Sequence, residues 1–234
     1  MWLSLSCQIA RLPTASRHAT AASSGRAARS LAGAAALATP RRLIVGISGA
    51  SGALYGVRLL EALAGGPVET HLVLSRSARL TLALETAWKP RDVEKLATAS
   101  YKPEDIGAAI ASGSFPTLGM VVAPCSTRSL AEIASGVTST LLTRAADVVL
   151  KERRRLVLLA RETPLHLGHL RNMVAVTEMG AIVMPPVPAL YARPRSIGDM
   201  VDQTVGRALD LFGIDNALVR RWRGTHAERG DDVD

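Results

Sequence analysis

The side chains best suited to chemistry gather in four short polar stretches, and each stretch directly follows an apolar run. The stretches are residues 48–52, Ser75, residues 124–129 and residues 161–164. Hydroxyl groups and the free N–H groups at the start of a helix bind phosphate well, because the helix dipole favours an anion there. This hydroxyl set therefore suits a phosphate better than a metal ion. Its candidate donors are Ser51, Ser75, Ser126, Thr127 and Ser129.

The first stretch lies in the segment GISGASGALYG, residues 46–56, whose glycines let the backbone turn tightly and approach a ligand. The segment lacks the Lys and Ser/Thr of a Walker A motif and the G-x-G-x-x-G order of a dinucleotide turn. It also lacks the G-x-S-x-G order of a hydrolase elbow. Taken alone, it is explained equally well by a tight turn that binds no ligand.

A charged pair, Arg161 and Glu162, follows the apolar run at 155–160 and places a cation and a carboxylate at the end of a predicted strand. Arg144, Lys151 and Arg207 add positive charge on neighbouring elements. For each of these basic residues alone, a solvated helix face is the simpler interpretation.

Metal and thiol chemistry have little support. The five histidines are scattered, and His166 and His169 have no carboxylate cluster near them, so we predict no metal site. Two cysteines, Cys7 and Cys125, cannot build a disulfide framework. Cys125 is either a nucleophile or, as is commoner for this residue type, a small side chain packed at a strand end.

The net charge of +8 is unevenly distributed along the chain. Residues 1–39 contain four arginines and no acidic residue, whereas the remaining residues carry 24 basic and 20 acidic side chains. Arginines spaced among Ala, Ser and Thr are typical of a mitochondrial or plastid transit peptide, and we favour the mitochondrion. The alternative is a disordered basic extension or a mispredicted start of the chain. The mildly basic remainder argues against a nucleic-acid-binding module, and no apolar run is long enough for a transmembrane segment.

Strands and helices alternate along the rest of the chain. Apolar runs predict strands at 43–47, 68–75, 118–126, 155–160 and 181–185. Helical spacing predicts helices at 53–63, 76–88, 103–112, 129–136, 141–152, 166–180 and 196–213. This order predicts an α/β fold with a single doubly wound, mostly parallel sheet and helices on both faces, whose ligands bind beyond the carboxyl ends of the strands. We expect a leader at 1–39, a domain at 40–223 and a loose tail at 224–234.

Several ordered segments closely resemble the UbiX-type flavin prenyltransferases. They are GISGASGALYG, SRSA with Glu85 ten residues after Ser75, IASGSFPTLGMVVAPCST, RAADVVLKERRRLVLLARETPL, HLRNM and GAIVMPPVPALY. The resemblance runs from about residue 42 to about residue 222.

The resemblance implies a flavodoxin-like or Rossmann-like fold assembled into a homododecamer. It implies an enzyme that binds FMN and transfers a dimethylallyl group from dimethylallyl monophosphate to N5 and C6 of the reduced flavin, without a metal. The product, prenylated FMN, implies a UbiD-type decarboxylase as the partner that receives it. Ubiquinone synthesis and aromatic acid decarboxylation both remain open as the downstream pathway.

Carried across residue by residue, the resemblance implies three groups of site residues. The FMN-binding positions are Gly49, Ala50, Ser51, Ser75, Ser126, Thr127, Arg128, Ser129 and Arg161. The positions for the prenyl phosphate are Tyr191, Arg207, Lys151, Arg144 and Trp222, which offer cations for the departing phosphate and aromatic faces for an allylic cation. The catalytic positions are Ser51, Glu85 and Glu162; Glu162 either accepts a proton from the flavin and passes it through Ser51 or returns a proton to the phosphate.

Two segments depart from the family pattern. Residues 138–142 read TSTLL where many members have an Asn or Asp-Asn pair, and Arg155 stands where a proline is frequent. We expect these changes to affect local packing more than chemistry. Two alternative functions share the predicted fold: a flavin-containing cysteine decarboxylase, whose Pro-x-Met-Asn loop is missing here, and a non-catalytic FMN-binding protein.

Overall fold

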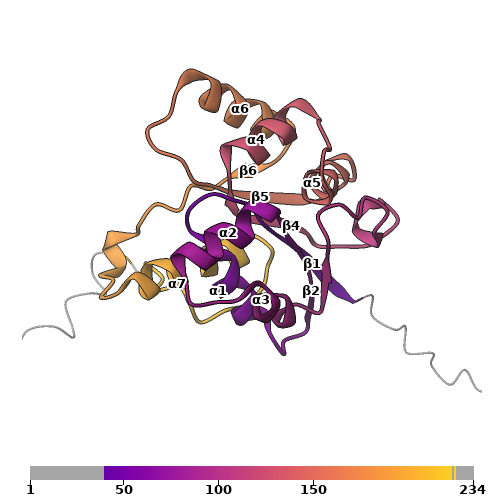
Figure 1. The fold of residues 1–234 in the computed structure, drawn as a ribbon. Coiled ribbons are helices and arrows are strands. Elements are labelled where there is room, and N and C mark those ends of the chain that lie inside the picture. Colours follow the sequence, from indigo (N-terminus) through magenta and orange to yellow (C-terminus); the bar gives the residue numbers. More distant parts are fainter. Residues whose placement is uncertain (1–39, 223, 225–234) are drawn as a thin grey trace, which may run out of the picture. The chain divides into compact units, whose positions relative to one another are not determined.

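Residues 40–222 and residue 224 are described by a computed structural model of the chain. They form a sheet that lies between two layers of helices (Figure 1). The predicted leader at 1–39 lies outside the described residues, as does the predicted tail apart from Gly224. None of the helices in the described part is both long and apolar enough to cross a membrane.

The sheet has six parallel strands in the order β3-β2-β1-β4-β5-β6. The strands are β1 Arg41–Ile47, β2 Val68–Leu74, β3 Ala99–Tyr101, β4 Gly119–Cys125, β5 Arg155–Ala160 and β6 Ile182–Val183. This is the strand order of a Rossmann sheet, and the chain's direction of travel across the sheet reverses between β1 and β4. The predicted doubly wound parallel sheet is confirmed, and its ligand crevice is expected beyond the carboxyl ends of these two strands.

The helices divide between the two faces of the sheet (Figure 1). One layer contains α1 Ala53–Leu63, α2 Arg76–Glu85, α3 Pro90–Leu96 and α7 Ile197–Asp210. The other contains α4 Thr127–Ser135, α5 Leu141–Lys151 and α6 Leu167–Glu178. Each layer packs on its own apolar core, so the sheet is buried on both faces.

Strand β1 shows why these segments read as continuous apolar runs. Leu43, Val45 and Ile47 pack into the core beneath α1 and α7, whereas Ile44 packs into the core on the other face. All four side chains are at most 1% exposed. Successive strand residues point to opposite faces, so a parallel strand covered by helices on both sides needs apolar residues at consecutive positions where it is buried.

Two glycines in the turn between β1 and α1 are required by its shape. Gly52 has φ 103°, a left-handed conformation that side chains other than glycine rarely adopt. At Gly49 an added Cβ would lie 2.3 Å from Cβ of Ser77, so only glycine lets the turn pass against the start of α2. The turn therefore lies close to the polar start of the next helix.

The helix predicted at 103–112 is wrong; only Ala109–Ala111 form a short 3-10 turn. The carbonyl of Pro103 accepts a hydrogen bond from the N–H of Leu141, the first residue of α5, so it is not available to a local helix. The sequence reading also missed helix α3 and the edge strand β3. Both are short, and α3 buries only Val93, which leaves too few apolar residues for a periodic pattern.

His71 on β2 is a buried titratable group, 6% exposed. Its Nδ1 lies 2.9 Å from the hydroxyl of Tyr101, its ring meets the edge of Phe115, and its Nε2 is buried without a hydrogen-bond partner. Burial lowers the pKa of His71 below its ordinary value; the Glu69 carboxylate opposes this shift and the Arg42 guanidinium adds to it. The folded protein therefore favours the neutral imidazole.

Acid is expected to destabilise the protein through His71. Below the ordinary histidine pKa of about 6.5 the unfolded chain binds more protons than the folded one, so the free energy of unfolding falls as pH is lowered toward the folded-state pKa. Urea unfolding at about pH 7.5 and about pH 5.5 measures this loss. His71→Gln should lose less stability over the same interval, and an equal loss in both proteins would contradict the assignment.

Candidate functional site

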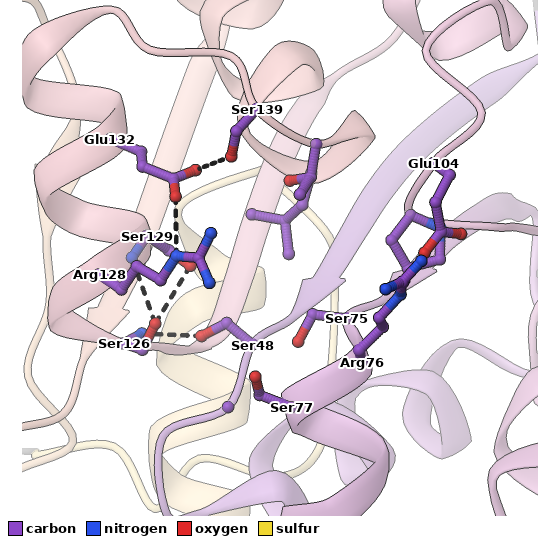
Figure 2. A pocket seen from close by; sticks show the side chains of 14 residues that line it. Ser48, Ser75, Arg76, Ser77, Glu104, Ser126, Arg128, Ser129, Glu132 and Ser139 are labelled. Atoms are coloured by element: carbon purple, nitrogen blue, oxygen red, sulfur yellow. Dashed lines mark hydrogen bonds and ion pairs between the residues drawn. The ribbon is translucent and has the colours of Figure 1, made fainter.

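A pocket of about 480 Å³ lies at the carboxyl ends of β1, β2 and β4, where the switch point of the sheet places it (Figure 2). Its volume lies in the usual range for small-molecule sites. The lining comes from the turns after the three strands and from α4, the start of α5 and the loop after β3. The lining residues are Ser48, Gly49, Ser75, Arg76, Ser77, Pro103, Glu104, Ser126, Arg128, Ser129, Glu132, Ser139, Thr140 and Leu142.

Hydroxyl groups connect the turns that form this pocket. Ser48 Oγ donates to the carbonyl of Pro124 at 2.8 Å and accepts from the N–H of Ser126 at 2.7 Å, which links the turn after β1 to the turn after β4. Ser126 caps α4 by accepting from the N–H of Ser129, and Ser75 caps α2 in the same way. The predicted clustering of polar stretches at one edge of the sheet is confirmed.

Two arginine–glutamate pairs carry the charge of the pocket. Arg76 Nε donates to Glu104 at 2.5 Å, and Arg128 Nε donates to Glu132 at 2.9 Å. Figure 2 shows the two pairs on opposite sides of the pocket, with the serines between them. Charges of both signs and many hydroxyls suit a ligand that combines an anion with neutral polar groups.

Glu85 changes the expectation for the first turn. Its carboxylate accepts the N–H groups of Gly52 at 2.8 Å and Ala53 at 3.1 Å, so the start of α1 is not free for a phosphate. Burial would raise the pKa of Glu85, but hydrogen bonds from Ser51, Gly52 and Ala53 and the charge of Arg161 outweigh it, and the pKa is lowered. The start of α1 already holds an anion, which the sequence reading did not foresee.

Three predicted site residues, Ser51, Glu85 and Arg161, lie together beside the turn that precedes α1. Ser51 is hydrogen-bonded to Glu85, and Arg161 acts electrostatically on both Glu85 and Tyr55. The N–H of Arg161 donates to the carbonyl of Cys125, which fixes the residue after β5 against the end of β4. Glu162 is exposed next to Arg161.

The predicted flavin positions fall into two groups. Those that line the pocket are Gly49, Ser75, Ser126, Arg128 and Ser129; those that do not are Ala50, Ser51, Thr127 and Arg161.

The residues predicted for a prenyl phosphate are spread over the fold within one chain. Arg144 lies in the first turn of α5, close to the pocket residues Thr140 and Leu142. Lys151 is the last residue of α5, shortly before β5 begins, so it lies at the amino ends of the strands. Arg207 lies one turn before the end of α7, and Gly213 beyond that end accepts a hydrogen bond from Arg41 at the start of β1. Lys151 and Arg207 therefore lie at the edge opposite the pocket.

Tyr191 and Trp222 do lie together. Their rings meet edge to face with 5.9 Å between centroids, and the Tyr191 hydroxyl accepts from Gln203 on α7 at 3.0 Å. Both side chains are about half exposed. They form an aromatic surface next to α7, separate from the pocket lining.

The sequence reading missed several pocket residues: Ser77, Glu104, Glu132, Ser139 and Thr140. Arg128 and Glu132 are four residues apart on a helix, a spacing that usually indicates a solvated surface pair. Thr140 belongs to a segment that departs from the family pattern, and there it caps α5 together with Thr143. Only tertiary contacts identify these residues as pocket lining.

Cys125 is fully buried, and burial raises the pKa of its thiol to about 12. A thiol that holds its proton this firmly is a poor nucleophile, so the packing explanation is the better one. Among the described residues no three His, Cys, Asp or Glu side chains are grouped so as to hold a metal ion.

Comparison with known proteins agrees with this geometry. The flavoprotein family model matches residues 35–209. The flavin prenyltransferase UbiX of Escherichia coli K12 is 59% identical over 187 residues, which cover 79% of this chain and 99% of the relative. The mitochondrial flavin prenyltransferase PAD1 of Saccharomyces cerevisiae is 51% identical over 185 residues, which cover 79% of this chain and 76% of the relative.

Two solved structures are similar throughout the domain. AnUbiX (PadA1), in complex with FMN and dimethylallyl pyrophosphate, has a TM-score of 0.78 and 50% identity, over 80% of this chain and 99% of that one. The dodecameric FMN-dependent UbiX-like decarboxylase of Escherichia coli O157:H7 has a TM-score of 0.77 and 52% identity, over 78% and 100% of the two chains. This chain therefore belongs to the flavoprotein family and, within it, to the UbiX-type flavin prenyltransferases.

Proposed function

We propose that this protein is a flavin prenyltransferase that moves a dimethylallyl group from dimethylallyl monophosphate to N5 and C6 of reduced FMN. The observation that carries the proposal is the convergence of the turns after β1, β2 and β4 on one pocket at the switch point of the sheet, through Ser48, Gly49, Ser75, Ser126, Arg128 and Ser129. Hydroxyls, two arginines and a volume of about 480 Å³ fit a phosphorylated flavin. Close relatives that carry this activity by name support it.

The pocket would hold the flavin, and the residues beside it would handle protons. Bonds to N5 and C6 of the reduced flavin would form while one carbon–oxygen bond breaks. N5 and C6 each lose a proton, one proton is added to the prenyl double bond and the other leaves with the phosphate, so the site needs groups that accept and return protons. Glu162, exposed at the end of β5, and the linked pair of Ser51 and Glu85 are the carboxylates and hydroxyl at this edge that we assign to that task. Breaking the bond between carbon and phosphate oxygen leaves a phosphate anion, which needs cations around it.

The positions of the predicted cations Lys151 and Arg207 indicate that more than one chain builds each site. Lys151 and Arg207 lie at the amino edge of the sheet, so they cannot reach the pocket of their own chain. We propose that neighbouring chains of a homododecamer bring Lys151, Arg207 and the Tyr191–Trp222 surface to a flavin held by another chain. The similar dodecameric protein from Escherichia coli O157:H7 supports this assembly.

The proposed product and the composition of residues 1–39 indicate a partner enzyme and a cellular location. Prenylated FMN would pass to a UbiD-type decarboxylase, and no metal takes part in the transfer. We propose a mitochondrial location, since a mitochondrial relative exists and residues 1–39 have the composition of a transit peptide. Fusing residues 1–39 to a fluorescent protein tests this: a fusion that stays outside mitochondria would contradict it.

Anaerobic incubation of the full chain with reduced FMN and dimethylallyl monophosphate, followed by mass measurement of the flavin, tests the activity. The flavin is expected to gain the mass of one dimethylallyl group less one hydrogen, and inorganic phosphate should be released in equal amount. Bound FMN of unchanged mass would favour the non-catalytic alternative. Decarboxylation of a peptide with a carboxyl-terminal cysteine would favour the cysteine decarboxylase.

A further inference from the structure

Arg128 lies at the start of α4, beside the pocket, with 77% of its side chain exposed. Its Nε donates to Oε1 of Glu132 at 2.9 Å. Neither terminal nitrogen of its guanidinium has a hydrogen-bond partner in the part of the chain that the structure describes. Figure 2 shows these two nitrogens directed away from Glu132 and toward the pocket. The donors of Arg128 that remain unengaged are therefore those that face the pocket.

Glu132 is held much more firmly than Arg128. Its side chain is only 16% exposed, and its second oxygen, Oε2, accepts from Ser139 Oγ at 2.7 Å. Burial would raise its pKa, but hydrogen bonds from Ser139, Arg128 and Thr143, with the charge of Arg128, outweigh burial and lower the pKa. The carboxylate is ionised at neutral pH, and both of its oxygens are engaged with protein donors.

The position of this charge is unusual for a phosphate pocket. An ionised carboxylate accepts hydrogen bonds only and repels a phosphate, so it opposes binding unless it serves another group. Here its two oxygens point to Ser139 and Arg128, on the α5 side and the ligand side respectively. Glu132 is thus placed to hold a cation against the ligand rather than to contact the ligand itself.

The other arginine–glutamate pair of the pocket lacks this support. The side chains of Arg76 and Glu104 are 81% and 52% exposed, and Arg76 is the only side chain that donates to Glu104 among the described residues. Pairs this exposed contribute little fixed geometry, because both side chains exchange partners with water. Both pairs place a guanidinium beside a carboxylate, but only the carboxylate of the Arg128–Glu132 pair is held in place by a further side chain.

We propose that Glu132 is a positioning residue that fixes the Arg128 guanidinium over the phosphate of FMN, with Ser139 holding Glu132 in turn. The inference rests on the proposed function. The start of α1 is already occupied by Glu85, so the phosphate would use another helix start at the pocket, and α4 is the one that carries Arg128. A cation fixed before the ligand arrives loses less side-chain entropy on binding than a mobile one.

The test compares the affinities of the full chain for FMN and for riboflavin, which lacks the phosphate, by quenching of flavin fluorescence. Glu132→Gln should weaken FMN binding about fivefold and leave riboflavin binding unchanged. Ser139→Ala should act in the same direction. In an Arg128→Ala background, Glu132→Gln should have no further effect, because the two residues act through one contact. Thermal unfolding of each variant checks that the fold is kept.

Each other outcome contradicts the proposal. Equal losses for FMN and riboflavin would mean that Glu132 only supports packing, and a full effect of Glu132→Gln without Arg128 would mean that the two act independently. The matched control is Glu104→Gln: a loss of FMN affinity there and not at position 132 would place the phosphate at the other pair. A native protein that binds no FMN would instead refute the proposed function.

Discussion

Replacing Glu162 by Gln is expected to leave FMN bound and to slow prenyl transfer by about 10²- to 10⁴-fold, the usual contribution of a general base. The exchange removes the base but keeps the local structure, because the Gln oxygen can still accept the N–H of Thr163 that Glu162 Oε1 accepts at 3.0 Å. Turnover of reduced FMN and dimethylallyl monophosphate, with FMN affinity measured separately, gives the result.

Glu178→Gln is the matched control for this experiment. Glu178 is the exposed last residue of α6, so the same chemical change there should leave turnover as in the native protein. If Glu162→Gln turns over normally, Glu162 has no part in the mechanism and Glu85 becomes the base to examine. If the Glu162→Gln protein loses FMN affinity as well as turnover, the role of Glu162 is in binding the flavin.

A mixture of two inactive variants is expected to regain activity. Arg207→Ala alone should lose about 10²-fold or more, the cost of removing one donor to a developing anion, and Glu162→Gln alone is slow as described above. If the cations of one chain serve the flavin of another, assemblies that contain both variants will include some sites with an intact Glu162 and an intact Arg207. Refolding or co-expressing the two variants and assaying the purified oligomer measures the recovery.

The structure indicates that Arg207→Ala will fold. Its ion-pair partner Asp210 also receives both terminal nitrogens of Arg221 and a hydrogen bond from Asn216, so the carboxylate keeps partners when Arg207 is removed. Simple mixing of pre-formed oligomers, without subunit exchange, is the control and should give no recovery. Co-assembled variants that stay inactive would show that each chain builds its site alone.

The sequence predicted the sheet well because its physical requirements are local. A parallel strand covered on both faces is apolar along most of its length rather than at alternate positions, so β1, β2, β4 and β5 were recognisable one at a time. Once their order was inferred, the polar residues that follow each strand had to meet at one edge. Ser75 and Ser126 could therefore be placed beside the first glycine turn without any distance being known.

The parts that the sequence could not supply depend on contacts between distant residues. Glu85 reads as an ordinary carboxylate at the end of a helix, and only the packing of α2 beside α1 brings it to the N–H groups of Gly52 and Ala53. Similarly, Ser139 reaches Glu132 across a turn that has no periodic pattern. The sequence also does not reveal that Lys151 and Arg207 lie away from the pocket, since sequence motifs do not tell which chain a residue serves.

The contact between Ser51 and Glu85 fixes the direction in which the Ser51 hydroxyl donates its hydrogen bond. Glu85 is ionised near neutral pH and can only accept, so the single proton of the Ser51 hydroxyl points to it. The Ser51 hydroxyl then has only the lone pairs of its Oγ to offer to a ligand. A Ser51→Ala protein with unchanged solvent isotope effects on turnover would argue against a relay through this hydroxyl. With the relay in place, a proton can leave the ligand through Ser51 while Glu85 is ionised and can return by the same route once Glu85 holds it, so the charge state of Glu85 sets the direction in which the relay runs.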